Sequence, residues 1–123
     1  MIYLDTHAVV WLLKGTDWLS LAARRLIDAE NVLVSPMVVF ELQMLYEKQR
    51  VKKGPQHFLD YLGKAIGLRV CDLPFYAIAR QAIDETWTRD PFDRLIVAQA
   101  RANKASLLTV DETIRKHYTK AVN

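Results

Sequence analysis

The sequence has little of the residues that disulfide-bonded or membrane-spanning proteins use. It contains one cysteine, Cys71, so no internal disulfide can form, and no set of cysteine and histidine residues has the spacing of a zinc site. No stretch approaches the roughly 20 apolar residues of a membrane helix, and the start lacks the basic and apolar segments of a signal peptide. We therefore expect a cytoplasmic protein without membrane association, in which Cys71 is a core thiol.

Glycine and proline are also scarce, with four residues of each among 123, and no glycine-rich or proline-rich linker divides the chain. A chain of this length fits one domain, residues 1–123, that can bury a sizeable core. Acidic residues are slightly outnumbered by basic ones, which gives a formal net charge of +3. This modest excess favours a polyanionic partner such as nucleic acid without requiring one.

Short apolar runs alternate with signals for helix starts along the chain. The apolar runs predict strands at 2–4, 32–34, 68–71 and 106–110. Ser35-Pro36 and Asp90-Pro91 are typical helix starts, because a capping side chain precedes a proline in the first helical position. Strands separated by helices need crossover connections, which favour parallel pairing with helices on both faces. The predicted fold class is α/β, a three-layer α/β/α sandwich with a mainly parallel sheet.

Four carboxylates occur where this topology can bring them together. Asp5 and Asp111 follow the first and last predicted strands, and the carboxyl ends of parallel strands meet at one edge of the sheet. Glu41 and Asp93 lie in early turns of helices that begin at that edge. Capping of a helix is the simpler explanation for each aspartate taken alone. Glu41 lies among apolar residues, where a lone buried carboxylate is costly unless it is paired, although a narrow solvent-facing stripe is the alternative.

A cluster of four carboxylates would need a positive counter-charge. At a separation of about 4 Å and an effective dielectric constant near 20, each like-charge pair costs roughly 4 kcal/mol. The whole folding free energy of a domain is only about 5 to 15 kcal/mol. Oxygen ligands suit hard cations such as Mg²⁺ or Mn²⁺. If the four acids converge, the sequence therefore predicts a divalent-cation site at this edge of the sheet.

Four stretches, LDTH at 4–7, SPMVVFEL at 35–42, DPFDRLIVAQA at 90–100 and LTVD at 108–111, resemble in order the motifs of PIN-domain ribonucleases of the VapC toxin type. The resemblance spans nearly the whole chain. It implies that the catalytic, metal-binding acids are Asp5, Glu41, Asp93 and Asp111. It also implies supporting hydroxyls at Thr6, Ser35 and Thr109. The family pattern leaves Asp90 or Asp93 as the third acid, and we choose Asp93 because its helix start aligns better.

The resemblance further implies a Mg²⁺- or Mn²⁺-dependent endoribonuclease, the toxin of a toxin–antitoxin pair. One or two ions would activate a water molecule to hydrolyse phosphodiester bonds of an RNA substrate. A VapB-type antitoxin and a second copy of the chain, forming a homodimer, are the implied protein partners. Arg94, next to Asp93, would contact a phosphate or pair with a neighbouring acid.

Other interpretations of these residues stay open. A PIN-like domain could bind RNA or a protein without cutting, and another α/β fold could carry a phosphorylated Asp5, although His7 stands where a haloacid-type phosphatase would have a second acid. The basic stretch from Lys48 to Lys53 suits either a helix end or phosphate contacts. Three tryptophans fit either the core or a protein interface: Trp11, Trp18 and Trp87.

Overall fold

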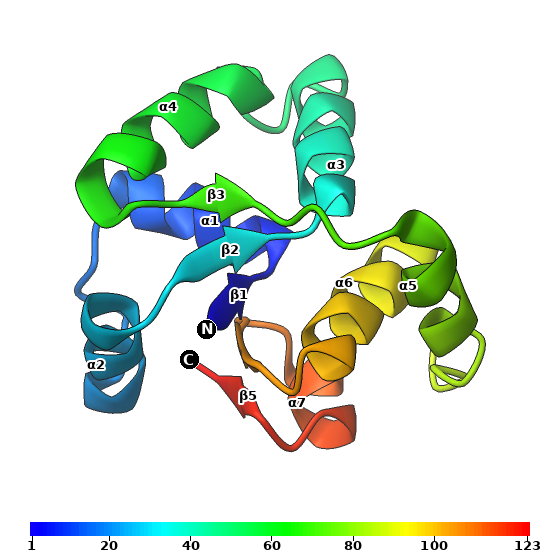
Figure 1. The fold of residues 1–123 in the computed structure, drawn as a ribbon. Coiled ribbons are helices and arrows are strands. Elements are labelled where there is room, and N and C mark those ends of the chain that lie inside the picture. The colour runs from blue at the N-terminus through cyan, green and yellow to red at the C-terminus, as the bar shows by residue number, and fades with distance from the viewer.

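A computed structural model describes residues 1–123 and contains a five-stranded sheet in which every pairing is parallel (Figure 1). The strands are β1 (Ile2–Leu4), β2 (Val32–Val34), β3 (Arg69–Val70), β4 (Ser106–Leu108) and β5 (Ala121–Val122), in the spatial order β3-β2-β1-β4-β5. The central strand β1 pairs with β2 and β4, and all three of its residues are buried. The predicted α/β class with a parallel sheet is confirmed.

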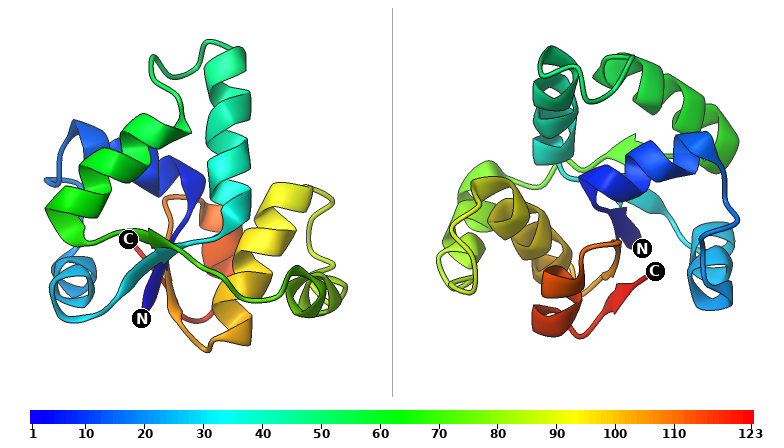
Figure 2. Two further views of the ribbon diagram at one scale, coloured as in Figure 1. Left: turned by 45° about the horizontal axis from the view of Figure 1, so that its top comes forward. Right: turned by 180° about the vertical axis from the view of Figure 1, so that it is seen from behind.

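Seven helices surround the sheet. They are α1 (Thr6–Lys14), α2 (Leu21–Ala29), α3 (Pro36–Glu47), α4 (Pro55–Ile66), α5 (Phe75–Ala82), α6 (Pro91–Ala102) and α7 (Glu112–His117). Among them, α5 packs on α6 rather than on the strands. Figures 1 and 2 show α1 and α4 on one side of the strands and α6 and α7 on the other. This arrangement is the predicted three-layer sandwich, and it leaves the carboxyl ends of the strands facing the starts of several helices.

The helices begin where the sequence predicts caps. Ser20 accepts a hydrogen bond from the backbone N–H of Ala23 at 3.1 Å, and Ser35 accepts one from Met37 at 3.1 Å. Each bond satisfies a donor that the first turn of the helix leaves unpaired. Gly67 ends α4 in the left-handed conformation, with φ of 72°, which glycine adopts without steric cost.

Two strands differ from the prediction. The strand predicted at 68–71 is shorter in the structure: β3 is an edge strand of two residues, Arg69 and Val70, whose side chains are exposed, whereas Leu68 and Cys71 on either side of it are buried as predicted. Tyr3 donates a hydrogen bond to the sulfur of Cys71 at 3.0 Å. The sequence did not predict β5, because a strand of two residues is too short to show a periodic pattern.

A cluster of 26 buried hydrophobic residues fills the space between the sheet and the helices. Ile2, Tyr3 and Leu4 of the central strand are at most 1% exposed and lie at its centre. None of the helices combines the length and the apolar character that crossing a membrane would require. The rigid strand β1 therefore carries the residue that follows it, Asp5, to a fixed place at the edge of the sheet.

Candidate active site

Asp5 follows β1 at the carboxyl edge of the sheet and is only 3% exposed. Its Oδ1 accepts a hydrogen bond from the backbone N–H of Thr6 at 2.8 Å, and its Oδ2 accepts one from the hydroxyl of Thr109 at 2.8 Å. Burial raises the pKa of Asp5, and these two hydrogen bonds partly oppose that rise because they stabilise the charged form. The carboxylate is thus held in one orientation and is poorly placed to be phosphorylated.

Glu41 lies on α3, is partly buried, and is linked to Asp5 through one residue, Thr6. The hydroxyl of Thr6 donates to Oε1 of Glu41, while the backbone N–H of the same threonine donates to Asp5. Burial raises the pKa of Glu41, the hydrogen bond from Thr6 opposes the rise, and the charge of Asp5 adds to it. Glu41 therefore does not lie on an exposed polar stripe, which was the alternative left open by the sequence.

Asp111 is linked to Asp5 on the other side by Thr109. Oδ1 of Asp111 caps α7 by accepting hydrogen bonds from the backbone N–H groups of Thr113 and Ile114, at 2.7 and 3.1 Å. The backbone N–H of Asp111 donates to the hydroxyl of Thr109 at 3.0 Å, and that hydroxyl donates to Asp5. Two fully buried threonines thus connect three of the predicted acids.

Asp90 and Asp93 stand at the start of α6. Oδ1 of Asp90 caps the helix through the backbone N–H groups of Phe92 and Asp93, at 2.9 and 3.3 Å. Burial raises the pKa of Asp93 to about 7, and the negative charges of the four other acids described above add to the rise. The five carboxylates therefore share one region of the molecule and act on one another electrostatically.

Ser35 and Arg94 do not join the acids. Ser35 is 1% exposed and caps α3. The guanidinium of Arg94 donates to the carbonyl oxygen of Ala82 at 3.0 and 3.2 Å and to that of Ile83 at 3.1 Å. Arg94 thereby fastens the end of α5 to α6 and forms no ion pair with a neighbouring acid, while its contact with a phosphate stays a prediction. His7 is exposed in the first turn of α1, where its charge would lower the pKa of Asp5.

The donor set fits a hard divalent cation, although the side chains are not gathered around a single point. No three Asp, Glu, His or Cys side chains are arranged so that they could hold one metal ion together. One oxygen of Asp90, one of Asp111 and one of Glu41 accept hydrogen bonds from protein donors. Their second oxygens, and both oxygens of Asp93, accept no hydrogen bond from the protein. These free oxygens match the all-oxygen ligation that Mg²⁺ and Mn²⁺ prefer.

An ion pair between buried Glu85 and partly exposed Arg101, which the sequence did not predict, holds the loop in front of Asp90. Glu85 is 3% exposed and accepts hydrogen bonds from Nε of Arg101 at 2.5 Å and from Nε1 of Trp87 at 2.6 Å. Arg101 belongs to α6, so this pair ties the connection between α5 and α6 to the helix that carries Asp93. Because Glu85 lies in a polar loop without periodicity, no sequence signal marks it as buried.

Comparisons with known proteins identify the family and the fold. Residues 2–120 match the sequence model of the family described as PIN domain. Ribonuclease VapC22 of Mycobacterium tuberculosis is 28% identical, over 94% of this chain and 91% of that protein. The structure of VapBC2 from Rickettsia felis bound to a DNA fragment from its promoter superposes with a TM-score of 0.67 at 22% identity, over 94% of this chain and 92% of that one. A toxin–antitoxin complex from Klebsiella pneumoniae superposes with a TM-score of 0.65 at 17% identity, over 100% of this chain and 97% of that one.

Proposed function

Because the chain belongs to the PIN domain family, we propose that it is a divalent-metal-dependent endoribonuclease and the toxin of a toxin–antitoxin pair. The grouping of Asp5, Glu41, Asp93 and Asp111, from four separate parts of the chain, at one edge of the sheet carries this proposal. The similarity to Ribonuclease VapC22 supports RNA as the substrate. We also propose that residues 1–123 form a single nuclease domain.

The same four acids would hold one or two Mg²⁺ or Mn²⁺ ions, with the free oxygens of Glu41, Asp93 and Asp111 as the accessible ligands. Such an ion, when bound, polarises the scissile phosphate and lowers the pKa of the attacking water. Hydrolysis adds the water oxygen to phosphorus, breaks the bond from phosphorus to the leaving oxygen, and transfers a proton to that oxygen. No side-chain nucleophile is needed, and Cys71 is buried away from the acids beside Tyr3.

The hydroxyl groups of the chain prepare the acids for this role. Thr6 donates to Glu41 and Thr109 donates to Asp5, so both carboxylates are oriented and their charged forms are stabilised against burial. The backbone N–H of Thr6 adds a third donor. These contacts keep negative charge at the edge of the sheet, where a cation and then a phosphate would approach.

The proposal is tested by incubating the purified protein with labelled single-stranded RNA in Mg²⁺, in Mn²⁺ and in a chelator. We expect cleavage in the metal buffers alone, and losses of at least about 100-fold for Asp5→Asn and Asp93→Asn. Asp28→Asn is the matched control, because Asp28 is exposed on α2 and its side chain makes no hydrogen bond or ion pair. Equal cleavage by the parent and both site variants would refute the assignment. Metal-independent binding of RNA without cleavage would indicate a PIN-like binding module instead.

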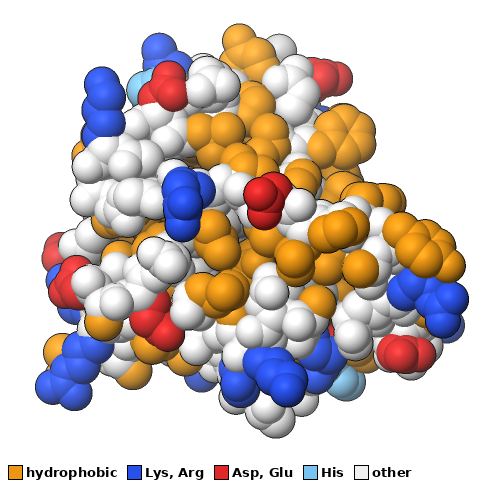
Figure 3. All heavy atoms as spheres, viewed as in Figure 1, with side chains coloured by type: hydrophobic (Ala, Val, Ile, Leu, Met, Phe, Trp, Pro, Cys, Tyr) orange, Lys and Arg blue, Asp and Glu red, His pale blue; other side chains and the backbone are white.

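We further propose that a VapB-type antitoxin covers the acidic site and that two copies of the chain pair. Support comes from the solved relatives, which are named as VapBC or toxin–antitoxin complexes. Hydrophobic side chains also gather over α3 and α5 in Figure 3, where Phe40, Phe75 and Tyr76 are 55, 60 and 72% exposed. Exposed apolar patches are typical of protein interfaces. The mass in solution, measured by light scattering, separates one copy from two.

A further inference from the structure

A groove with an apolar floor and a cationic rim lies beside α1, at the end of that helix remote from the acids. Its volume is about 420 Å³, and α1, the loop between α3 and α4, and α4 supply four apolar side chains to its floor. Its rim consists of Lys14, Arg50, Lys52 and Lys53, and no acidic residue lines it. We call these four residues the cationic rim.

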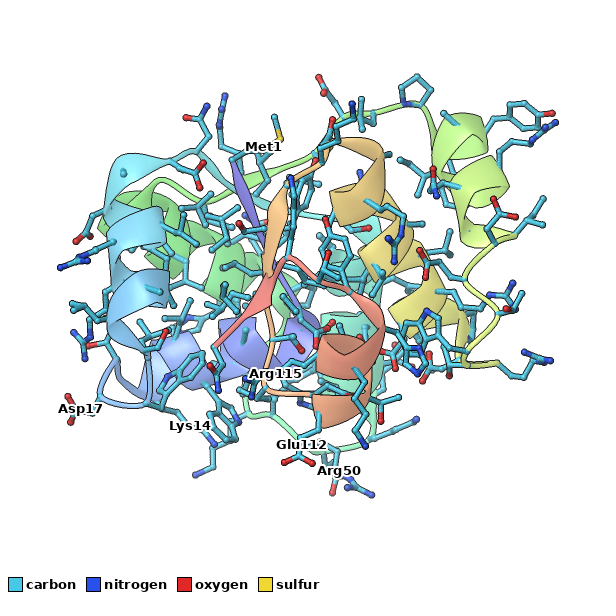
Figure 4. The ribbon with its side chains drawn as sticks, turned by 90° about the horizontal axis from the view of Figure 1, so that it is seen from below. Met1, Lys14, Asp17, Arg50, Glu112 and Arg115 are labelled. Atoms are coloured by element: carbon cyan, nitrogen blue, oxygen red, sulfur yellow. The ribbon has the colours of Figure 1, made fainter.

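The cations of the rim have no partner within the protein. All four are exposed, and none takes part in an ion pair or donates a side-chain hydrogen bond. Lys14 lies in the last turn of α1, where the helix dipole favours a cation. Lys52 and Lys53 lie in the loop between α3 and α4, so the dipole of α1 does not explain their presence. Figure 4 shows Lys14 and Arg50 projecting from the same side of the molecule; Glu112 of α7 also projects there, outside the lining of the groove. Four like charges around one groove favour an anionic ligand.

The exposed face of α1 connects this groove to the acids. His7, Trp11 and Lys14 are spaced four and three residues apart, so they lie on one face of the helix, and all three are exposed. The helix begins at Thr6 beside the acids, and its nine residues extend about 13 Å. Trp11 is 42% exposed and meets Trp18 edge to face, with 5.4 Å between ring centroids. An aromatic surface therefore lies between the acids and the cationic rim.

We propose that the exposed face of α1 and the cationic rim bind the single-stranded RNA that flanks the cleaved bond, with phosphates against the rim and a base stacked on Trp11. This inference rests on the proposed ribonuclease function for its choice of ligand. Grooves that combine positive charge with an aromatic platform are typical of single-strand binding. A protein segment is the less suitable occupant, because the groove continues toward the acids along the exposed face of α1, as the strand that flanks a cleaved bond requires.

The binding test removes three charges of the rim. Lys14, Arg50 and Lys52 are changed to glutamine, and the matched control changes Arg25, Lys64 and Arg69, which are equally exposed and line none of the grooves described. Binding of a labelled single-stranded RNA is followed by fluorescence anisotropy in a chelator, across a range of salt concentrations. The rim variant is expected to bind about 10- to 100-fold more weakly and to lower the slope of log K against log salt by about 2, or 0.7 for each lost phosphate contact.

A second variant and a cleavage assay keep the inference testable whatever the triple variant does to folding. Trp11→Ala is expected to weaken RNA binding by about 5- to 100-fold, while Trp11→Phe restores most of it by keeping an aromatic face. In Mg²⁺, the loss of kcat/KM in the rim variant should be at least about tenfold larger for a long strand than for a trinucleotide, through KM.

Rim and control variants that bind RNA equally, with the same salt slope, would overturn the inference and leave the groove to an acidic protein segment. Failure of the ribonuclease proposal is recognised separately. A protein that binds RNA through the rim but cuts none refutes the nuclease and supports the groove, whereas normal cleavage with an unchanged KM in the rim variant refutes the groove alone.

Discussion

Replacement of Asp93 by asparagine is expected to stabilise the metal-free protein while it abolishes cleavage. The side chain of Asp93 accepts no hydrogen bond from the protein, so the amide loses no partner. Its carboxylate is partly buried and lies in the negative field of four other acids, which is why its pKa is raised to about 7. Removal of this charge relieves both the burial cost and the repulsion.

The magnitude follows from the rise in pKa. A rise from 3.8 to about 7 corresponds to about 4 kcal/mol if it is fully expressed in stability. Because Asp93 is only partly buried, water screens the interaction and we retain about 1 to 2 kcal/mol. Loss of a negative charge in the first turn of α6 costs about 0.5 kcal/mol in the opposite direction. The net gain in the free energy of unfolding is therefore about 1 kcal/mol above neutral pH.

The stability gained by Asp93→Asn should increase with pH, whereas a gain caused by better packing would not depend on pH. A raised carboxyl pKa means that the folded state binds the proton more tightly than the unfolded state, so the parent loses stability as the pH rises from about 4 to about 7. The advantage of Asp93→Asn should thus be small at about pH 4 and full at about pH 8. Urea titrations in a chelator, with Asp28→Asn as control, measure it.

Two results would refute this reasoning about Asp93. An advantage of the same size at both pH values would show that titration of the carboxyl group is not its cause. A variant less stable than the parent at about pH 8 would show that the repulsion is already compensated. Addition of Mg²⁺ should reverse the order, because a ligand that binds only the folded parent stabilises it by an amount that grows with the logarithm of its concentration relative to Kd.

Two further substitutions probe the contacts around the acids. Thr109→Val removes the hydroxyl that donates to Asp5 and should lower the free energy of unfolding by about 1 to 2 kcal/mol in urea; a value equal to the parent's would contradict the role of that bond. Glu85→Gln leaves Arg101 without its buried partner and should cost about 2 kcal/mol, whereas Glu30→Gln, which breaks an exposed pair, should cost under about 1 kcal/mol. Equal losses in the two glutamate variants would mean that the burial of Glu85 contributes nothing.

The starts of the helices were predictable because their signals are local. Ser35 and Asp90 each precede a proline, and each accepts hydrogen bonds from the turn that follows. The exposure of the β3 side chains was not predictable in the same way, because the sequence of the strand does not reveal that it lies at the edge of the sheet. β5 is two residues long and exists through its pairing with β4, which is a tertiary contact without a sequence pattern.

The edge of the sheet at which the acids lie was predictable from topology, but the proximity of Asp5 to Asp111 also depends on β1 and β4 being neighbouring strands, which the sequence did not predict. In a sheet whose strands are all parallel, the residues that follow β1 and β4 lie at one edge, and Thr109 joins Asp5 to the backbone of Asp111 there. The partner of Arg94 was not predictable, because its contact with the carbonyl groups at the end of α5 depends on how α5 packs against α6. The choice of Asp93 as the third acid stays a prediction, supported by the capping role of Asp90.

The hydroxyl groups explain why Asp93, and not Asp5, is the informative position for a charge experiment. Asp5 is the more deeply buried acid, but both of its oxygens accept hydrogen bonds, so asparagine would place an amide N–H against a protein donor and add an unrelated penalty. Glu41 has the same difficulty, because Thr6 donates to it. Asp93 receives no such donor. The stability change at this position therefore reports the electrostatic cost of gathering the acids, which is the property that a cation site requires.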